Sequence, residues 1–324
     1  ITGGAGFIGS HLTDRLLGQG KHVTVLDNFN EFYDPLVKRE NVQAHLGKSS
    51  FNLVQGDIRD PVQLKILFAE NQFDVVVHLA AMAGVRPSLI DPAHYMDVNV
   101  LGTQRIFDAI EQSGQKPLFV FGSSSSVYGE RTEEKFFESD RSDRPMSPYA
   151  ASKIASEAVA FTAHHTRGLD VVSLRFFTVY GPRQRPDLAI HKFCDLMYRD
   201  QQIEIYGDGT SRRDYTYVDD IVDGVERVIA LESPGYEVIN LGRSQPVVLM
   251  DVIRSLEKHL GKPAKIVHKP MQMGDVPNTY AGIDRAAELL GYAPSRSLDY
   301  GIGEFVRWYL TSGSRKKEIA SSVS

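Results

Sequence analysis

The sequence has very little cysteine and no long apolar run. Cys194 is its single cysteine, so no disulfide can form within the chain, and a free thiol fits a reducing compartment. No apolar stretch approaches the ~20 residues that a membrane-spanning helix needs, and none resembles a signal peptide. We therefore expect a cytoplasmic protein that does not bind a membrane.

Basic clusters and metal-binding patterns are also scarce. The net charge is −5, and the basic run at residues 315–317 is most simply a solvated tail, so we expect no nucleic-acid partner. The 10 histidines form no HExxH motif. His164 and His165 have no carboxylate or cysteine at ligand spacing, so we expect no metal site.

Internal repeats and low-complexity linkers are absent as well. The 324 residues, 42% hydrophobic and 24% charged, suit one large domain or two small domains that share a cleft. A second domain is therefore expected to be small and interleaved with the first.

What the sequence does contain, close to its start, is a glycine-rich loop. Gly3, Gly6 and Gly9 satisfy both GxxGxxG and GxGxxG and lead into an apolar-periodic helix. Such a loop lets backbone N–H groups approach a pyrophosphate at the helix N-terminus. The next strand, residues 22–26, ends at Asp27, whose carboxylate can accept hydrogen bonds from an adenosine ribose and repels a 2′-phosphate, which favours NAD over NADP. A structural glycine turn with a surface aspartate is the alternative.

Strands and helices alternate through the first half of the chain. Further strands are expected at residues 51–54, 73–79, 118–121 and 171–176, and one of the helices between them at about 94–112. This alternation predicts an α/β protein with a doubly wound parallel Rossmann sheet, with ligands beyond the carboxyl ends of the strands. Ile1-Thr2 resembles the end of a first strand, so we expect further residues before it in the natural protein.

The pattern loosens after residue 176. We expect a basic loop at 178–186, helices at 190–199 and 218–231, strands at 203–206 and 236–240, and helices with a loop at 272–277 in the remainder. We expect an NAD-binding Rossmann domain of residues 1–175, to which about 214–242 return. A smaller, interleaved α/β substrate domain comprises 176–213 and 243–324.

A tyrosine and a lysine lie one helical turn apart in the middle of the chain. Pro148 begins a helix on which Tyr149 and Lys153 stand at i and i+4, on one face. A phenol has a pKa near ~10 in water, and a nearby cation favours its phenolate, so Tyr149 can take a proton from a sugar hydroxyl near neutral pH. The serine-rich loop 122–129 follows the fifth strand, where Ser124 can hydrogen-bond the same hydroxyl. The alternative is a tyrosine packed on a helix, with its lysine in solvent and an ordinary polar loop nearby.

These motifs together resemble the extended short-chain dehydrogenases/reductases that act on nucleotide sugars, over nearly the whole chain. The motifs are the glycine loop, Asp27, Ser124, the run 149–153 and the run Arg212–Tyr215. Within that family, residues 83–88, 123–129 and 174–187 resemble UDP-glucuronate 4-epimerases. The resemblance implies an isomerase that interconverts UDP-glucuronate and UDP-galacturonate through a 4-keto intermediate on tightly held NAD. It also implies a homodimer formed through helices 94–112 and 148–166.

Departures from related families sharpen this expectation. Related 4,6-dehydratases carry Asp and Glu where this chain has Ser125 and Ser126, so chemistry beyond C4 lacks its acid and base. UDP-glucose epimerases usually carry asparagine in place of Thr178 and lack the arginine pair Arg183 and Arg185, which indicates a substrate with a carboxylate. A 4-keto glucuronate is a β-keto acid that can lose carbon dioxide. We expect Thr178, Arg185 and Ser125 or Arg86 to hold its carboxylate against that loss.

The resemblance assigns a role to each candidate residue. Ser124, Tyr149 and Lys153 are expected to be catalytic, with Tyr149 as the base. NAD is expected to contact Gly3, Gly6, Phe7, Ile8, Gly9, Asp27, Asn28, Asn30, Asp57, Ile58, Leu79, Ala80, Ala81, Ala83, Asn99, Ser123, Tyr149, Lys153 and Phe176. The UDP-sugar is expected to contact Arg86, Ser124, Ser125, Ser126, Thr178, Arg185, Tyr206, Arg213, Gln272 and Asp275.

Three other functions remain open from the sequence. The nearest is a 4-epimerase of UDP-glucose or UDP-N-acetylglucosamine, with Arg185 merely on the surface. A sugar-nucleotide dehydrogenase or reductase would consume free NAD stoichiometrically. A non-catalytic NAD-binding regulator with a vestigial site would turn over no UDP-sugar.

Overall fold

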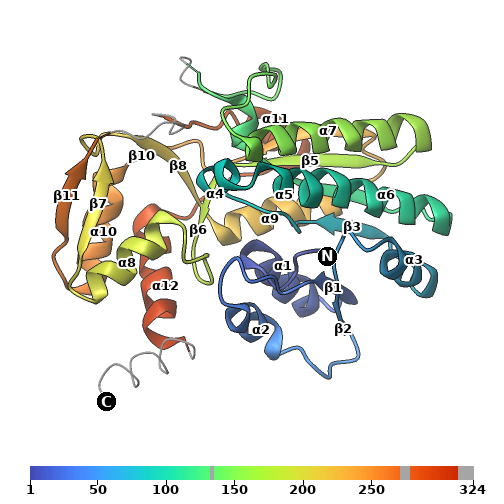
Figure 1. Cartoon of the computed structure of the whole chain (residues 1–324), viewed down its shortest axis with the longest axis horizontal. Coiled ribbons are helices and arrows are strands. Elements are labelled where there is room, and N and C mark those ends of the chain that lie inside the picture. The colour runs from blue at the N-terminus through green and yellow to red at the C-terminus, as the bar shows by residue number, and fades with distance from the viewer. Residues whose placement is uncertain (132–134, 271–277, 313–324) are drawn as a thin grey trace.

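A parallel β-sheet forms the centre of the molecule (Figure 1). The computed structural model of the chain describes residues 1–131, 135–270 and 278–312. In the sheet, β1 pairs with β2, and four more strands follow in the order β3-β4-β5-β9, all parallel. Their bounds are β1 Val23–Asp27, β2 Phe51–Gln55, β3 Val75–His78, β4 Leu118–Ser124, β5 Val171–Phe176 and β9 Tyr236–Leu241.

Thr2 lies between β1 and β3 in this sheet. It forms single parallel bridges with Leu26 and His78, and its N–H donates to the carbonyl of Val77 at 3.0 Å. The Thr2 hydroxyl also hydrogen-bonds the buried His78 ring at 2.6 Å. The strand order is therefore β2-β1-Thr2-β3-β4-β5-β9, and the expected fold class, a doubly wound parallel sheet, is confirmed.

Helices cover both faces of the sheet. In β4, Phe119 and Phe121 pack into one buried cluster with helices α3, α6 and α7, whereas Val120 packs into the other with α1 and α9, because successive strand residues point to opposite faces. The helices of this part are α1 Phe7–Gly18, α2 Pro35–Gln43, α3 Pro61–Glu70, α4 Val85–Ile90, α5 Pro92–Met96, α6 Gly102–Ser113, α7 Pro148–Arg167 and α9 Val218–Ile229.

Helix α7 begins where the sequence predicts. Ser147 is extended and its hydroxyl accepts a hydrogen bond from the N–H of Ala150, Pro148 occupies the first turn, and Gly168 ends the helix in a left-handed conformation. The expected helix at 94–112 is instead divided into α5, a π-helical turn at Asp97–Leu101 and α6. In that turn the carbonyl of Asn99 accepts the hydroxyls of Thr103 at 2.5 Å and of Ser156 at 3.0 Å, side-chain partners that a sequence pattern does not reveal.

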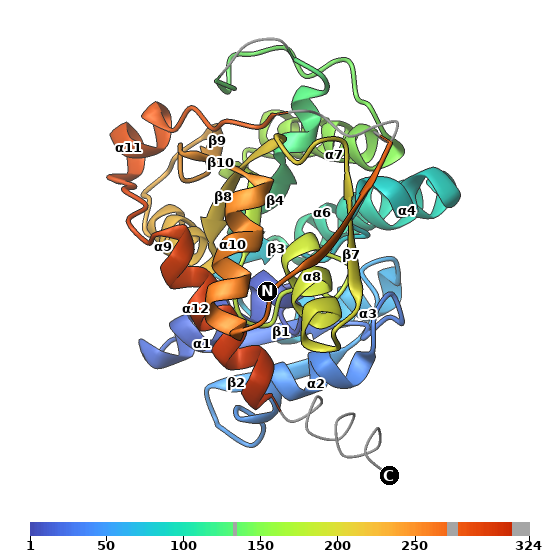
Figure 2. The same ribbon diagram turned by 90° about the vertical axis from the view of Figure 1, so that its left-hand side faces the viewer.

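Two small sheets and helices α8, α10 and α12 form the other side of the molecule, nearest the viewer in Figure 2, whereas helix α11 packs against β9 and α9 of the central part. Strand β8 pairs with β6 in parallel and with β10 antiparallel, and β7 pairs with β11 in parallel. The expected loop at 178–186 was wrong for its first three residues, which pair with β8 and form β6, and strands β8, β10 and β11 were not predicted. The elements are β6 Thr178–Tyr180, β7 Gln202–Tyr206, β8 Arg212–Tyr217, β10 Pro246–Val248, β11 Lys265–Lys269, α8 Ala189–Tyr198, α10 Leu249–Leu260, α11 Asp284–Leu290 and α12 Leu298–Thr311.

Candidate active site

A cavity of about 470 Å³ opens at the carboxyl ends of the parallel strands. Asp27 enters it from the end of β1, Leu79 to Ala83 from the segment after β3, Ser123 and Ser124 from the end of β4, and Phe176 from the end of β5. This is the edge at which a doubly wound sheet binds its ligands. A smaller cavity of about 170 Å³ shares Val85, Ser125, Ser126 and Thr178 with the first and reaches Arg213.

The glycine loop is packed too tightly for a side chain at Gly3 or Gly9. Gly3 has a φ of +68°, and a Cβ added to it would lie 2.7 Å from the backbone nitrogen of Ala80. A Cβ on Gly9 would lie 2.8 Å from the Cα of Gly4. Gly6 caps α1, a helix of 12 residues, and the first residues of this helix, 7–9, line the cavity. The N–H groups of a first helical turn have no partner within the helix and can bind an anion.

Two charged residues lie at the β1 end of the cavity. Asp27 is 7% exposed and accepts the N–H groups of Ala5 at 3.1 Å and Phe29 at 2.9 Å, and burial raises the pKa of its carboxyl. Lys38, which the sequence analysis missed, lines the same end and donates to the carbonyl of Asn30 at 2.8 Å and to its side-chain oxygen at 3.0 Å. It belongs to helix α2, for which no motif was recognised.

Two predicted cofactor residues do not line the cavity. Asp57 forms an ion pair with Arg59 at 2.8 Å and accepts the amide of Asn28 at 3.0 Å, and the Arg59 guanidinium lowers the pKa of Asp57. Asn99 is buried behind the wall, where its amide oxygen and nitrogen bond the backbone N–H and carbonyl of Met82 at 2.8 and 2.9 Å. Asn99 therefore fixes the cavity-lining Met82 rather than facing the cavity.

Ser124, Tyr149 and Lys153 all line the main cavity. Burial raises the pKa of the Tyr149 phenol, while a hydrogen bond with Ser124 and the positive charge of Arg185 lower it. Lys153 donates to the carbonyl of Gly122 at 2.7 Å, and burial lowers its pKa to about 8. The Ser124 hydroxyl and the Arg185 guanidinium therefore both favour the phenolate form of Tyr149.

Glu157 continues the Tyr149–Lys153 face of α7 by one more turn. Its carboxylate accepts the Ser123 hydroxyl at 2.5 Å and both Nε and Nη2 of Arg175, at 3.0 and 2.8 Å. Glu157 also opposes the fall in the Lys153 pKa. The i+4 spacing of Tyr149, Lys153 and Glu157 was a signal in the sequence that the analysis missed.

Of the predicted arginine pair, Arg185 lines the main cavity and Arg183 does not. Its Nε and Nη2 donate to the two carboxylate oxygens of Asp187 at 2.9 and 2.8 Å. The guanidinium also lies 5.4 Å from the centre of the Phe32 ring. Ser125, Ser126 and Thr178 share this end of the cavity with it.

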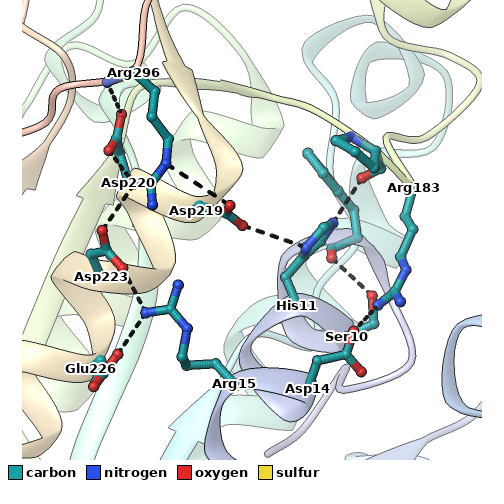
Figure 3. Close-up of polar contacts among 12 residues, drawn as sticks. Ser10, His11, Asp14, Arg15, Arg183, Asp219, Asp220, Asp223, Glu226 and Arg296 are labelled. Carbon is teal, nitrogen blue, oxygen red and sulfur yellow. Dashed lines mark hydrogen bonds and ion pairs between the residues drawn. The ribbon is translucent and has the colours of Figure 1, made fainter. Parts of the chain in front are cut away.

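Arg183 points the other way, toward α1 (Figure 3). It forms an ion pair with Asp14 at 2.8 Å, and the ring of His11 hydrogen-bonds the carbonyl of Pro182 at 2.9 Å. Arg183 adopts a φ of +63°, an unusual conformation for a residue with a side chain. The two arginines that the sequence analysis treated as a pair are therefore separated by this turn, and only Arg185 lines the cavity.

Three further predicted substrate residues, Arg86, Tyr206 and Arg213, do not line the main cavity. Arg213 lines the smaller cavity. The Arg86 guanidinium lies 4.9 Å from the centre of the Tyr206 ring, and neither residue belongs to the lining of either cavity. Gln272 and Asp275 fall outside the described residues.

Comparison with known proteins now identifies the family. Residues 1–242 match the NAD dependent epimerase/dehydratase family. The chain belongs to this family. No helix among residues 1–131, 135–270 and 278–312 is long and apolar enough to cross a membrane, and no group of three or more metal-binding side chains occurs in those ranges.

Relatives within the family resemble the chain over nearly its whole length. UDP-glucuronate 4-epimerase 4 of Arabidopsis thaliana is 41% identical, over 99% of this chain and 77% of the relative. UDP-glucuronate 4-epimerase of Thermodesulfobacterium geofontis is 40% identical, over 95% and 94%. The crystal structure of UDP-glucuronic acid 4-epimerase from Bacillus cereus, with UDP-glucuronic acid and NAD, is 37% identical with a TM-score of 0.89, over 95% and 97%. UDP-glucose 4-epimerase of Thermotoga maritima is 30% identical with a TM-score of 0.87, over 98% of each chain.

Proposed function

We propose that this protein is an NAD-dependent 4-epimerase that interconverts UDP-glucuronate and UDP-galacturonate. The observation that carries the proposal is the composition of the main cavity. Tyr149, hydrogen-bonded to Ser124, lines the same cavity as the tight glycine loop and Arg185. Relatives named UDP-glucuronate 4-epimerase, at about 40% identity over nearly the full chain, support it.

The residues of the main cavity fit NAD. The glycine loop leaves room only for backbone beside the N-terminus of α1, which suits a pyrophosphate. Asp27 and Lys38 at the β1 end suit the hydroxyls of an adenosine ribose, and a carboxylate there disfavours a 2′-phosphate. The glycine loop, Asp27 and Lys38 would hold the cofactor, which would supply reversible hydride transfer at the C4 carbon of the sugar.

Side chains of the protein must remove the proton from the C4 hydroxyl. Tyr149 accepts it as a phenolate, and Ser124, hydrogen-bonded to Tyr149, relays or stabilises it. Lys153 lines the same cavity, and when protonated it is a further cation that favours the phenolate in this proposal. Ser125 and Ser126 supply no general acid or base for elimination at C5 and C6.

Arg185 and Thr178 hold the carboxylate of the sugar in this proposal. Charge-assisted hydrogen bonds are worth about 1.5–3 kcal/mol each. A carboxylate that Arg185 and Thr178 keep ionised and in a fixed orientation resists decarboxylation at the 4-keto stage. Ser125 and Ser126 line the same end of the cavity, whereas Arg86, as placed beside Tyr206, would have to leave that ring to take part.

A second candidate is a 4-epimerase of neutral UDP-hexoses. The observation that favours it is the ion pair of Arg185 with Asp187, which already balances the charge meant for a sugar carboxylate. A proton NMR time course with UDP-glucuronate and with UDP-glucose decides between the two. Turnover of UDP-glucose alone would reject the proposed function, and the mass of any co-purifying ligand gives an independent answer.

We further propose that the protein is a homodimer in the cytoplasm. Large apolar side chains are exposed on the helices expected to pair, with Met96 37%, Leu101 41% and Phe161 49% exposed. Leu101→Lys should produce a monomer by light scattering, whereas Ile66→Lys on α3, where the side chain is 51% exposed, should not. A monomeric wild type would contradict this.

The division into an NAD-binding domain (1–175 with about 214–242) and a substrate domain (176–213 and 243–324) is also retained as a proposal. It would be tested by limited proteolysis with and without UDP-sugar. Protection of sites in 176–213 and 243–312 by the sugar nucleotide is the expected result.

A further inference from the structure

Arg185 and Asp187 form a two-pronged ion pair at the wall of the main cavity. The two carboxylate oxygens of Asp187 accept from Nε and Nη2 of Arg185, at 2.9 and 2.8 Å. The side chains are 19% and 34% exposed, respectively. A turn in which the N–H of Leu188 donates to the Arg185 carbonyl at 3.2 Å keeps the two residues side by side.

The surroundings of the guanidinium restrict where else it can point. The Phe32 ring lies 5.4 Å from it, and Nη2 lies 3.9 Å from the position that a Cβ on Gly84 would occupy. Arg185 is thus held between two walls of the cavity, with one edge of its planar group taken by a carboxylate of the protein. Arginine binds carboxylates in this forked geometry with high geometric specificity.

This pairing has a consequence for ligand choice. A sugar carboxylate that enters the cavity meets an ion pair whose charges are balanced, so it gains the guanidinium only by replacing Asp187 or by sharing the group with a second negative charge. A neutral hexose makes no such demand. The strength of the Arg185–Asp187 pair therefore sets how strongly the site prefers a uronate.

We propose that Asp187 is a specificity-determining residue, which competes with the carboxylate of the sugar for the guanidinium of Arg185. This inference rests on the proposed function for its substrate class. Asp187 moves no proton in it and touches no reacting atom. When no uronate is bound, the Asp187 carboxylate pairs with the guanidinium. Because a uronate must compete with this carboxylate, Asp187 lowers the affinity of the site for uronates.

The test is a binding measurement on the NAD-loaded protein. Isothermal titration calorimetry gives the Kd of UDP-glucuronate and of UDP-glucose for wild type and for Asp187→Asn. We expect the Kd of UDP-glucuronate to fall by roughly tenfold, since a competing charge-assisted bond is worth at least that much, and the Kd of UDP-glucose to stay unchanged. Asp187→Glu, which keeps a carboxylate, should stay near the wild-type values.

A matched control exists elsewhere in the chain. Arg141 and Asp143 form an ion pair with the same two-residue spacing, and neither residue lines the main or the smaller cavity. Asp143→Asn should leave both Kd values unchanged. Should Asp187→Asn fail to retain NAD, Asp187→Ser provides the same measurement.

The outcomes separate the inference from the proposed function. A Kd of UDP-glucuronate that is unchanged or higher in Asp187→Asn overturns the inference and makes Asp187 a residue that merely positions Arg185. An equal gain for both nucleotides also overturns it. Because the readout is binding, it stands even if wild type binds but does not epimerise UDP-glucuronate, a result that would reject the proposed function alone.

Discussion

The two ends of the cavity are built from different parts of the chain and by different means. The end that we propose for the cofactor contains the glycine loop with Asp27 and Lys38, and its Gly3 and Gly9 are packed against neighbouring backbone. The end that we propose for the sugar contains Ser124 to Ser126, Thr178 and Arg185, and its lining carries hydroxyl groups and a positive charge. Shape therefore determines which ligand the cofactor end can bind, whereas single side chains can change which ligand the sugar end prefers.

Tyr149 lies where the two ends meet, so its removal should affect catalysis without affecting either end. For Tyr149→Phe we expect kcat to fall by roughly 10³-fold, the scale of general acid–base catalysis, with the retained NAD and the Kd of UDP-glucuronate nearly unchanged. NMR turnover, NAD absorbance and calorimetry measure the three quantities. Conversion at the original rate would contradict the role given to the phenol.

Gly9→Ala tests whether the cofactor end is fixed by shape. The added Cβ would lie 2.8 Å from the Cα of Gly4, so the loop must move. Overpacking of about 1–3 kcal/mol corresponds to a loss of roughly 5–150-fold in NAD affinity. Gly18→Ala in the same helix is the control, because nothing lies within 4 Å of the Cβ it adds. Equal NAD retention in the two variants would show that the loop is not shape-limited.

Lys153 offers a test of burial between the two ends. Its pKa in the folded protein is about 8, against an ordinary value of 10.5, so between these pH values the unfolded chain binds more protons than the folded one. Stability must therefore rise with pH across this window. Without NAD, we expect urea unfolding of wild type to gain roughly 2–3 kcal/mol from pH 8 to 10.5 relative to Lys153→Met. Parallel stability curves would place Lys153 in solvent.

Arg185→His tests whether the sugar end is set by charge. We expect kcat/KM for UDP-glucuronate to fall by about tenfold, the loss of one charge-assisted bond, and a 4-keto pentose to accumulate because the β-keto acid is no longer held. Mass spectrometry detects the pentose, and UDP-glucose serves as the insensitive substrate. Unchanged product purity would reject the role of Arg185 in protecting the carboxylate.

The difference between the two ends also explains what the sequence predicted. The glycine loop and Asp27 are contiguous with a strand and a helix, so local spacing was enough to place them in one cavity. The start of α7 was likewise set by Ser147 and Pro148. Lys38 was missed because its only link to Asp27 is through space.

Long-range pairing accounts for the other misses. Thr178 became part of a strand because β8, more than thirty residues later, pairs with it. The partners of Asn99 and Glu157 lie on separate helices and strands. The directions of Arg183 and Arg185 depend on a backbone turn and on α1, which no motif encodes.

Arg183 gives the smallest expected effect and separates the two arginines. Its ion pair with Asp14 is half-exposed and worth at most about 1 kcal/mol, whereas its φ of +63° costs a residue with a side chain roughly 1–2 kcal/mol. Arg183→Gly relieves this cost and Arg183→Ala does not. In urea unfolding, the glycine variant should therefore be more stable than the alanine variant by about 1 kcal/mol. Neither variant should release 4-keto pentose, since Arg183 does not line the cavity. Formation of 4-keto pentose by both variants would mean that the turn at Arg183 positions Arg185 for binding the sugar carboxylate.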